Sequence, residues 1–188
     1  MAAVLVEYLD DAEPLTFEDV AVQCRIDDDD ERAFIERIVI PGARQAAERK
    51  SGAAIRKARY VERLAGLFAG EFPLSVGQVR SVDSIEARDV SGTASTLDPS
   101  RYELVQLGRE TLCALLGEAH WPSARAVTIT YQAGIDIDKH PAVRSWMLLA
   151  AAWAYDHREL FSEGQGIAQM PDGYTNVLLD SITVPPRF

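Results

Sequence analysis

The sequence has 188 residues, of which 47% are hydrophobic, 26% charged and 8% aromatic. This is the size and composition of one ordinary soluble globular domain, stable without disulfides or a structural metal. Nineteen Lys and Arg against 29 Asp and Glu give a formal net charge of -10, which is the wrong sign for a protein that binds nucleic acid by neutralising its phosphates.

The hydrophobic residues are not arranged for a membrane or for export. The longest apolar run, Trp146 to Tyr155, has ten residues, against the roughly 20 that a membrane-spanning helix requires. The N-terminus lacks a basic lead and reaches Glu7 after five apolar positions, so we expect the chain to stay in the cytosol where it is made. Cys24 and Cys113 fit no zinc or redox spacing, and we expect both to be reduced and buried.

The first 14 residues end in a polar stretch with Pro14, which predicts a flexible N-terminal arm. Thr16 is a suitable N-cap residue and predicts a short helix over about Phe17 to Cys24. Leu15 before the cap and Val20 inside the helix are spaced to pack as a hydrophobic staple.

Four consecutive aspartates, Asp27 to Asp30, permit two interpretations. An EF-hand needs a turn glycine and alternating ligands that close on a later glutamate, and that pattern is absent. We therefore favour a helix start in which Asp28 and Glu31 form a capping box. Apolar residues at spacings of three and four predict a long helix ending near Ser51, with a kink at Pro41. The stripe consists of Phe34, Ile35, Ile38, Val39, Ala43, Ala46 and Ala47.

Short alternating segments punctuated by Gly and Pro predict an antiparallel β region at about 54–134. The clearest strand is Val127 to Tyr131, with one buried and one wet face. Two more are predicted at Ser81–Val90 and Arg101–Leu107, whereas Leu112–Leu116 fits a returning strand and a short helix equally well.

A second long helix is predicted to begin at Pro141. Apolar residues cover most of its sides, so it is either the central helix of the domain or is covered on one flank by another subunit. Trp146 and Trp153 on this helix are predicted core or interface residues rather than ligand-stacking residues. Residues 164–188 are predicted to form an extended tail with little regular structure, whose apolar anchors are Met170, Tyr174, Leu178, Leu179 and Phe188.

The sequence contains no arrangement that is typical of catalysis. A Walker loop, a Gly-x-Ser-x-Gly elbow and a His-Glu-x-x-His pair are all absent. His157 and Glu159 are the sharpest acid-base pair, but residues two apart on a helix do not face one another. We therefore predict no enzyme activity, no cofactor and no metal.

Ordered fragments spread over most of the chain carry a resemblance to a known family, although residues 56–71 match least and the first 14 do not match. They are Leu15–Val20, Cys24–Asp27, Ala43–Glu48, Ser51–Ile55, Phe72–Leu74, Val79, Val82, Ile85, Trp121-Pro122, Val127–Gly134, Pro141–Val143, Arg158-Glu159, Pro171 and Val177–Leu179. In their order and spacing the chain resembles the small head-tail connector (adaptor, or head completion) proteins of tailed bacteriophages and prophages.

The resemblance implies a structural protein of the virion, made in the cytoplasm of the bacterial host and without catalytic residues. Such a protein forms a ring, typically of twelve subunits, beneath the portal and joins the capsid to the tail. The implied partners are further copies of the chain, the portal protein, a tail-side head-closure protein, and DNA that passes through the ring without specific binding.

The residues add three observations that agree with this resemblance: a helix apolar on many sides, an arm and tail suited to reaching a neighbour, and a negative charge that lets DNA slide past. The fold class that we predict is α+β, with a helical core of the two N-terminal helices and the Pro141 helix, and the β insertion between them. One domain over 15–163 is expected, and truncation after Glu163 is expected to weaken docking but leave the core folded.

Two alternatives remain from other classes. A regulatory module that binds a host protein would form a stable heterodimer without self-association. A small enzyme would need a deep pocket that gathers dispersed residues such as Asp136, His157 and Glu159.

Overall fold

The computed structural model describes residues 3–65, 71–116, 124–157 and 172–185. Contacts group the chain into two compact units. Unit 1 comprises Met1–Asp11, Gly52–Ile135 and Ile182–Phe188, and unit 2 comprises Ala12–Ser51 and Asp136–Ser181. Unit 1 contains the strands and unit 2 the α-helices, so the mixed content agrees with the α+β class.

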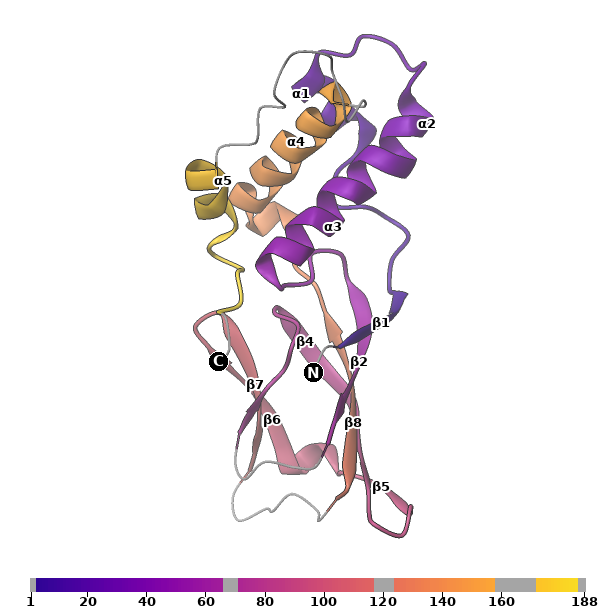
Figure 1. Cartoon of the computed structure of the whole chain (residues 1–188), viewed down its shortest axis with the longest axis vertical. Coiled ribbons are helices and arrows are strands. Elements are labelled where there is room, and N and C mark those ends of the chain that lie inside the picture. Colours follow the sequence, from indigo (N-terminus) through magenta and orange to yellow (C-terminus); the bar gives the residue numbers. More distant parts are fainter. Residues whose placement is uncertain (1–2, 66–70, 117–123, 158–171, 186–188) are drawn as a thin grey trace, which may run out of the picture. The chain divides into compact units, whose positions relative to one another are not determined.

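Unit 1 is built from two antiparallel sheets (Figure 1). The larger sheet has the order β1-β2-β8-β4-β5 and the smaller has the order β3-β7-β6. The strands of the larger sheet are β1 (Val4–Tyr8), β2 (Ala58–Leu64), β8 (Ala126–Ala133), β4 (Val79–Arg88) and β5 (Ala94–Thr96). Those of the smaller sheet are β3 (Phe72–Pro73), β7 (Glu110–Leu115) and β6 (Tyr102–Leu107), and the 3-10 turn η2 (Pro99–Arg101) precedes β6.

Strand β8 lies at the centre of the larger sheet and shows the predicted alternation. Val127, Ile129 and Tyr131 are buried, whereas the threonines between them are half-buried. Its neighbours are β2 on one side and β4 on the other. The buried face of β8 shares a hydrophobic core with Phe72 of β3 and Cys113 of β7, so the two sheets enclose one core.

The segment Leu112–Leu116, which periodicity leaves open between strand and helix, is mostly strand. Residues Glu110–Leu115 form β7, which pairs with β6 across the turn at Gly108-Arg109. The turn at Gly108-Arg109 therefore decides between strand and helix, because it returns the chain antiparallel to the preceding strand.

The predicted N-terminal arm contains strand β1, which pairs antiparallel with β2 from Val4↔Val61 to Tyr8↔Ala58. The Leu9 N–H extends this contact by donating to the Lys57 carbonyl at 2.9 Å. These residues are an edge strand of unit 1 rather than a separate arm, because their β-favouring side chains meet a sheet edge that local sequence does not reveal.

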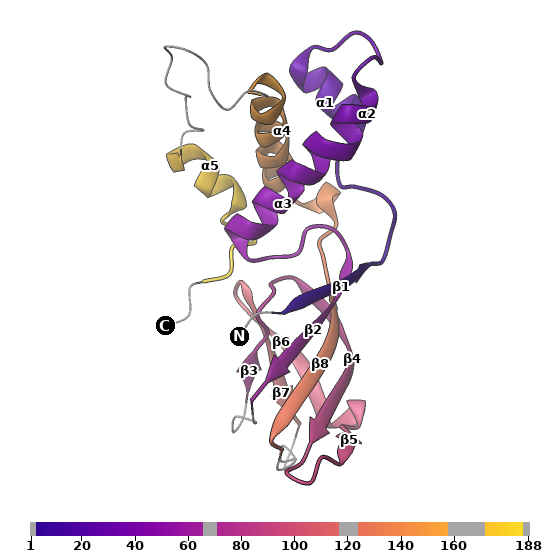
Figure 2. The same cartoon turned by 45° about the vertical axis from the view of Figure 1, so that its right-hand side comes forward.

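Unit 2 is helical, and the long Pro141 helix is its centre (Figure 2). Its elements are α1 (Phe17–Cys24), α2 (Arg32–Phe34), the π-helical turn η1 (Ile35–Val39), α3 (Ile40–Ser51), the 3-10 turn η3 (Ile137–Lys139), α4 (Pro141–Asp156) and α5 (Asp172–Leu179). Helix α4 contacts α1, η1, α3 and α5. These contacts bury one face of α4, whereas Leu148, Leu149 and Trp153 on its other sides are half-buried.

Helix α1 begins and ends where the sequence predicts. The Thr16 hydroxyl accepts from the Asp19 N–H at 3.2 Å, and the Asp19 carboxylate accepts from the Thr16 N–H at 2.9 Å. Leu15 and Val20 are both buried, as a hydrophobic staple requires.

The start of the next helix differs from the prediction. Instead of capping a helix with Glu31, the Asp28 carboxylate accepts from the Asp30 N–H at 3.1 Å and closes a turn. The helical run then continues from Arg32 to Ser51, and the irregularity expected at Pro41 is the π-helical turn just before it. Proline has no N–H to donate, and the wider i→i+5 pattern accommodates this defect without ending the helix.

The C-terminal segment has more structure than the extended tail predicted over 164–188. Residues Asp172–Leu179 form α5, Leu179 is 1% exposed, and Ile182 is fully buried. The short apolar cluster at 177–179 is therefore part of a packed helix. Met170 and Phe188 lie outside the described residues.

Candidate interaction surface

The two tryptophans predicted as core or interface residues have different environments. Trp146 is 5% exposed and belongs to the core of unit 2. Trp153, near the end of α4, is half-buried and stacks on His157 with ring centroids 4.8 Å apart. Trp146 is thus inaccessible to a partner, whereas part of Trp153 remains on the surface.

The predicted tail anchors do not form one surface among the described residues. Leu179 is buried, and Leu178 is half-buried. The neighbouring Val177, which the prediction did not single out, is 70% exposed. Met170, Phe188 and the side chain of Tyr174 lie outside what the structure describes.

Of the residues named for an enzyme, Asp136 and His157 have separate partners, and Glu159 lies outside the described residues. Nδ1 of the exposed His157 lies 2.9 Å from the Trp153 carbonyl oxygen, and Asp136 pairs with Lys139 at 3.1 Å. Within the described ranges, no group of three or more His, Cys, Asp or Glu could hold a metal ion. In those same ranges, no helix is long and apolar enough to cross a membrane.

Unit 1 contains a buried carboxylate that sequence reasoning missed. Glu62 of β2 is 2% exposed and accepts hydrogen bonds from the Ser75 N–H at 2.9 Å, from the Ser75 hydroxyl and from the Tyr131 hydroxyl at 3.2 Å. Burial, followed by the charge of Glu62, raises the pKa of Tyr131. The cluster links β2, β8 and Ser75, which follows β3, in the interior of unit 1. We therefore assign it a structural role.

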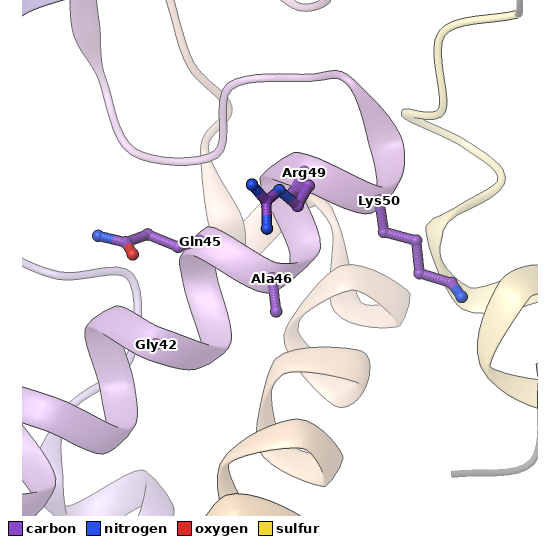
Figure 3. Close-up of a pocket in the computed structure, with 5 residues that line it drawn as sticks. All are labelled: Gly42, Gln45, Ala46, Arg49 and Lys50. Carbon is purple, nitrogen blue, oxygen red and sulfur yellow. The ribbon is translucent and has the colours of Figure 1, made fainter. Parts of the chain in front are cut away.

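The exposed face of α3 in unit 2 carries a hollow (Figure 3). It has a volume of about 680 Å³, and the described residues that line it are Gly42, Gln45, Ala46, Arg49 and Lys50. Their spacings of three and four place all of them on one helix face, and all five are exposed. The sequence prediction counted Ala46 in the buried stripe; Ala43 and Ala47 are buried, but Ala46 belongs to this open face.

Gly42 is not required by close packing among the described residues. It lies within a helix, and a Cβ added to it would meet no atom within 4 Å. A glycine in a helix interior costs about 1 kcal/mol relative to alanine. The α3 backbone is therefore left uncovered at this position, where another chain can approach it closely.

The two arginines on this helix have opposite surroundings. Arg44 is 2% exposed and is held by Glu13 at 2.7 and 3.2 Å and by Glu48 at 2.7 Å. Arg49, which lines the hollow, is exposed and forms no ion pair among the described residues. The inward arginine stabilises the unit, and the outward arginine gives the hollow positive charge.

The turn before α2 carries the opposite charge. Asp27 to Asp30 are all exposed. Arg32 pairs with Asp29 at 3.0 Å, with Glu18 at 2.9 Å and with Glu36 at 3.3 Å. The carboxylates of Asp27 and Asp30 form no ion pair within the described ranges, so the turn keeps a net negative charge.

Comparison with known proteins gives a fold likeness but no family. No family model matches the chain, and no curated protein matches it. Among solved structures, the chain is similar to chains of gene transfer agent (GTA) particles. The TM-score is 0.73 for a chain of the native GTA virion, 0.70 for a chain of the empty-particle neck computed with C6 symmetry, and 0.64 for a chain of the native-particle neck computed with C12 symmetry.

Each alignment covers 100% of this chain and 98% of the other chain at 20% sequence identity. At this identity the likeness shows the fold alone. The chain has the fold of these neck and virion chains along its whole length.

Proposed function

We propose that this protein is a structural component of the head-tail junction of a tailed phage or phage-like particle. The observation that carries the proposal is the likeness to GTA neck and virion chains, which extends over the entire chain with TM-scores up to 0.73. The resemblance of the sequence to head-tail connectors points in the same direction, and it rests on residues rather than on backbone shape.

In more detail, we propose an adaptor ring beneath the portal, with about twelve copies of the chain, that joins the capsid to the tail. The portal, a tail-side head-closure protein and further copies of the chain are its proposed partners. The net charge of -10 supports a DNA passage without specific binding, because a negative ring repels phosphates. Met170, Tyr174, Leu178 and Phe188 remain proposed docking residues, together with the accessible part of Trp153.

The proposal is tested by the mass of the purified protein, measured by light scattering over a concentration series, alone and with the portal protein from the same gene neighbourhood. We expect a species of about 250 kDa, which is twelve chains of 20.7 kDa, or co-migration with that portal. A portal from an unrelated phage is the control.

A monomer or dimer that does not bind the portal from its own gene neighbourhood contradicts the proposal. That result favours the regulatory binding module, and a stable heterodimer with a host protein would then identify it.

A further inference from the structure

We propose that the hollow on α3 is the docking site for a second copy of this chain, and that its occupant is the acidic turn Asp27–Asp30 of that copy. The inference rests on the proposed ring and identifies the surfaces that would close it. Both surfaces belong to unit 2, so each copy offers one hollow and one turn.

The first argument is the open backbone at Gly42. In the part of the chain that the structure describes, nothing lies within 4 Å of the position that its Cβ would take, yet a glycine in a helix destabilises the helix. Together with Ala46 it leaves a shallow section in a hollow of about 680 Å³, which is large enough to admit several side chains of a docked turn. Close approach of a partner gives the small residues a role that their own fold does not.

The second argument is complementary charge. Arg49 and Lys50 line the hollow, and Arg49 has no ion-pair partner among the described residues. Asp27 and Asp30 are exposed carboxylates that also lack an ion pair in those ranges. Complementary charges favour the encounter of two surfaces, so the exposed acidic turn is a surface that the basic face of the hollow attracts.

The third argument is geometry, because the two surfaces lie toward opposite ends of one helical run. The run from Arg32 to Ser51 consists of segments of 3, 5 and 12 residues and is about 30 Å long at 1.5 Å per residue. The hollow begins at Gly42, about 15 Å along the helix axis from the turn, which is farther than an aspartate side chain extends. A turn therefore cannot fill the hollow of its own molecule, but it can fill that of a neighbour.

Docking of the turn of one copy into the hollow of the next is a head-to-tail contact. Such contacts use two different patches on each subunit, and they form closed rings when the rotation between neighbours closes. The contact thus has the type that the proposed adaptor ring requires, whereas a two-fold symmetric dimer would need one patch that fits itself.

Charge reversal on each side tests the contact. One variant carries Gln45→Glu and Arg49→Glu in the hollow, and the other carries Asp27→Lys and Asp30→Lys in the turn. We expect each variant alone to lose self-association at least tenfold, measured by sedimentation with and without the portal. An equimolar mixture should recover it, because every hollow in an alternating assembly then faces a turn of opposite charge.

A steric variant tests the hollow without changing charge. Gly42→Leu fills it with a helix-favouring residue, so the fold should remain intact while self-association falls at least tenfold. The matched controls are Ala33→Leu and Arg37→Glu, at exposed positions of the same helical run outside the hollow, and both should associate like the unaltered chain. Thermal melting confirms the fold of each variant.

The inference is overturned if the charge-reversed chains and Gly42→Leu associate like the unaltered chain, if the mixture shows no recovery, or if the unaltered chain stays monomeric with and without the portal. Unchanged assembly of the variants together with normal portal binding refutes only the α3 contact. A chain that neither self-associates nor binds its portal refutes the proposed function as well.

Discussion

Asp19 connects the start of α1 to α4 through one carboxylate. It accepts from the Thr16 N–H at the start of α1 and from Arg144 of α4 at 2.7 Å. Burial acts to raise the pKa of Asp19, but these hydrogen bonds outweigh it and lower the pKa below its usual value. The folded state therefore prefers the ionised form, and the pairing stabilises the unit only where Asp19 is charged.

We expect Asp19→Asn to destabilise the protein by about 1–2 kcal/mol at pH 7, because it removes half of a capping box and one ion pair. A lowered pKa contributes stability above the unfolded value near 4 and loses it as the pH falls through the folded value. The difference between the two chains should thus shrink below about pH 4. Urea unfolding at pH 7, 4 and 3 measures it, and Asp27→Asn should change stability little at any of these pH values.

The two cysteines differ in accessibility, although both were expected to be buried. Cys113 is fully buried, and burial raises the pKa of its thiol to about 12. Cys24 is half-buried, and burial, followed by the charge of Asp156, raises the pKa of its thiol. At pH 8 only about one Cys113 in ten thousand is a thiolate.

A thiol reagent at pH 8 should therefore leave Cys113 unmodified in the folded chain and label both cysteines in denaturant. Mass spectrometry of the labelled peptides shows which of the two cysteines has reacted under each condition. Rapid labelling of Cys113 without denaturant would contradict its place in the core.

Gly42→Ala tests whether the α3 backbone is open at this position. The added methyl group meets open space and the backbone is helical, so we expect a gain of about 0.5–1 kcal/mol in the free energy of unfolding. Denaturant unfolding checks it. A loss of stability would mean that the α3 backbone is not free at this position.

At the scale of elements, Gly134 marks where β8 leaves the larger sheet. Its φ is +143°, and an added Cβ would lie 2.6 Å from the Lys57 Cα just before β2. The obstacle is backbone, which cannot move aside as a flexible side chain would. The close approach of these two chain segments therefore depends on the absence of a side chain.

We expect Gly134→Ala to destabilise the protein by about 3 kcal/mol or more, from a backbone clash together with an unfavourable φ. Gly92 is the matched control, since its φ is +90° but nothing lies within 4 Å of an added Cβ. Gly92→Ala should cost only about 1–2 kcal/mol. If Gly134→Ala and Gly92→Ala lowered the free energy of unfolding equally, the backbone clash at Gly134 would contribute nothing, which would contradict this prediction.

Elements with a local signal were predictable, and elements defined by a distant partner were not. Thr16 marks α1, alternation marks β8, and the apolar faces mark α4, because each signal lies within the element. Strand β1 depends on the edge of β2, 50 or more residues away, and α5 depends on packing against α4. The π-helical turn before Pro41 has no sequence signature of its own.

The sequence predicts only part of the exposed face of α3. Gln45 and Arg49 are polar residues four apart, which indicates an outward helix face. Periodicity placed Ala46 in the stripe beside Ala47, because small apolar residues fit either face. The hollow emerges only when the neighbours of the helix are known.

At the scale of the molecule, the C-terminal segment belongs to the packed structure. Leu179 is buried in unit 2 and Ile182 in unit 1. Loss of a buried Leu or Ile side chain costs about 2–5 kcal/mol, and a whole domain is stable by only about 5–15 kcal/mol. The sequence predicted that truncation after Glu163 leaves the core folded. From the burial of Leu179 and Ile182 we now expect the truncation to destabilise the core.

Truncation after Glu163 should unfold the chain or reduce its stability by most of its total, as seen in thermal melting. Val177→Ala, at a residue that is 70% exposed, is the control and should change stability by less than about 0.5 kcal/mol. The docking role proposed for Phe188 is then better tested in the full chain with Phe188→Ala. A truncated chain that melts like the full chain would contradict the burial of Leu179 and Ile182.

The alternation of the two units along the chain also sets an order for biosynthesis. Ribosomes make the segments of unit 1 first, in the middle and last, with those of unit 2 between them. The nascent chain cannot bury Ile182 until nearly all of both units has been made. Products of interrupted translation that end before residue 182 therefore lack a complete core.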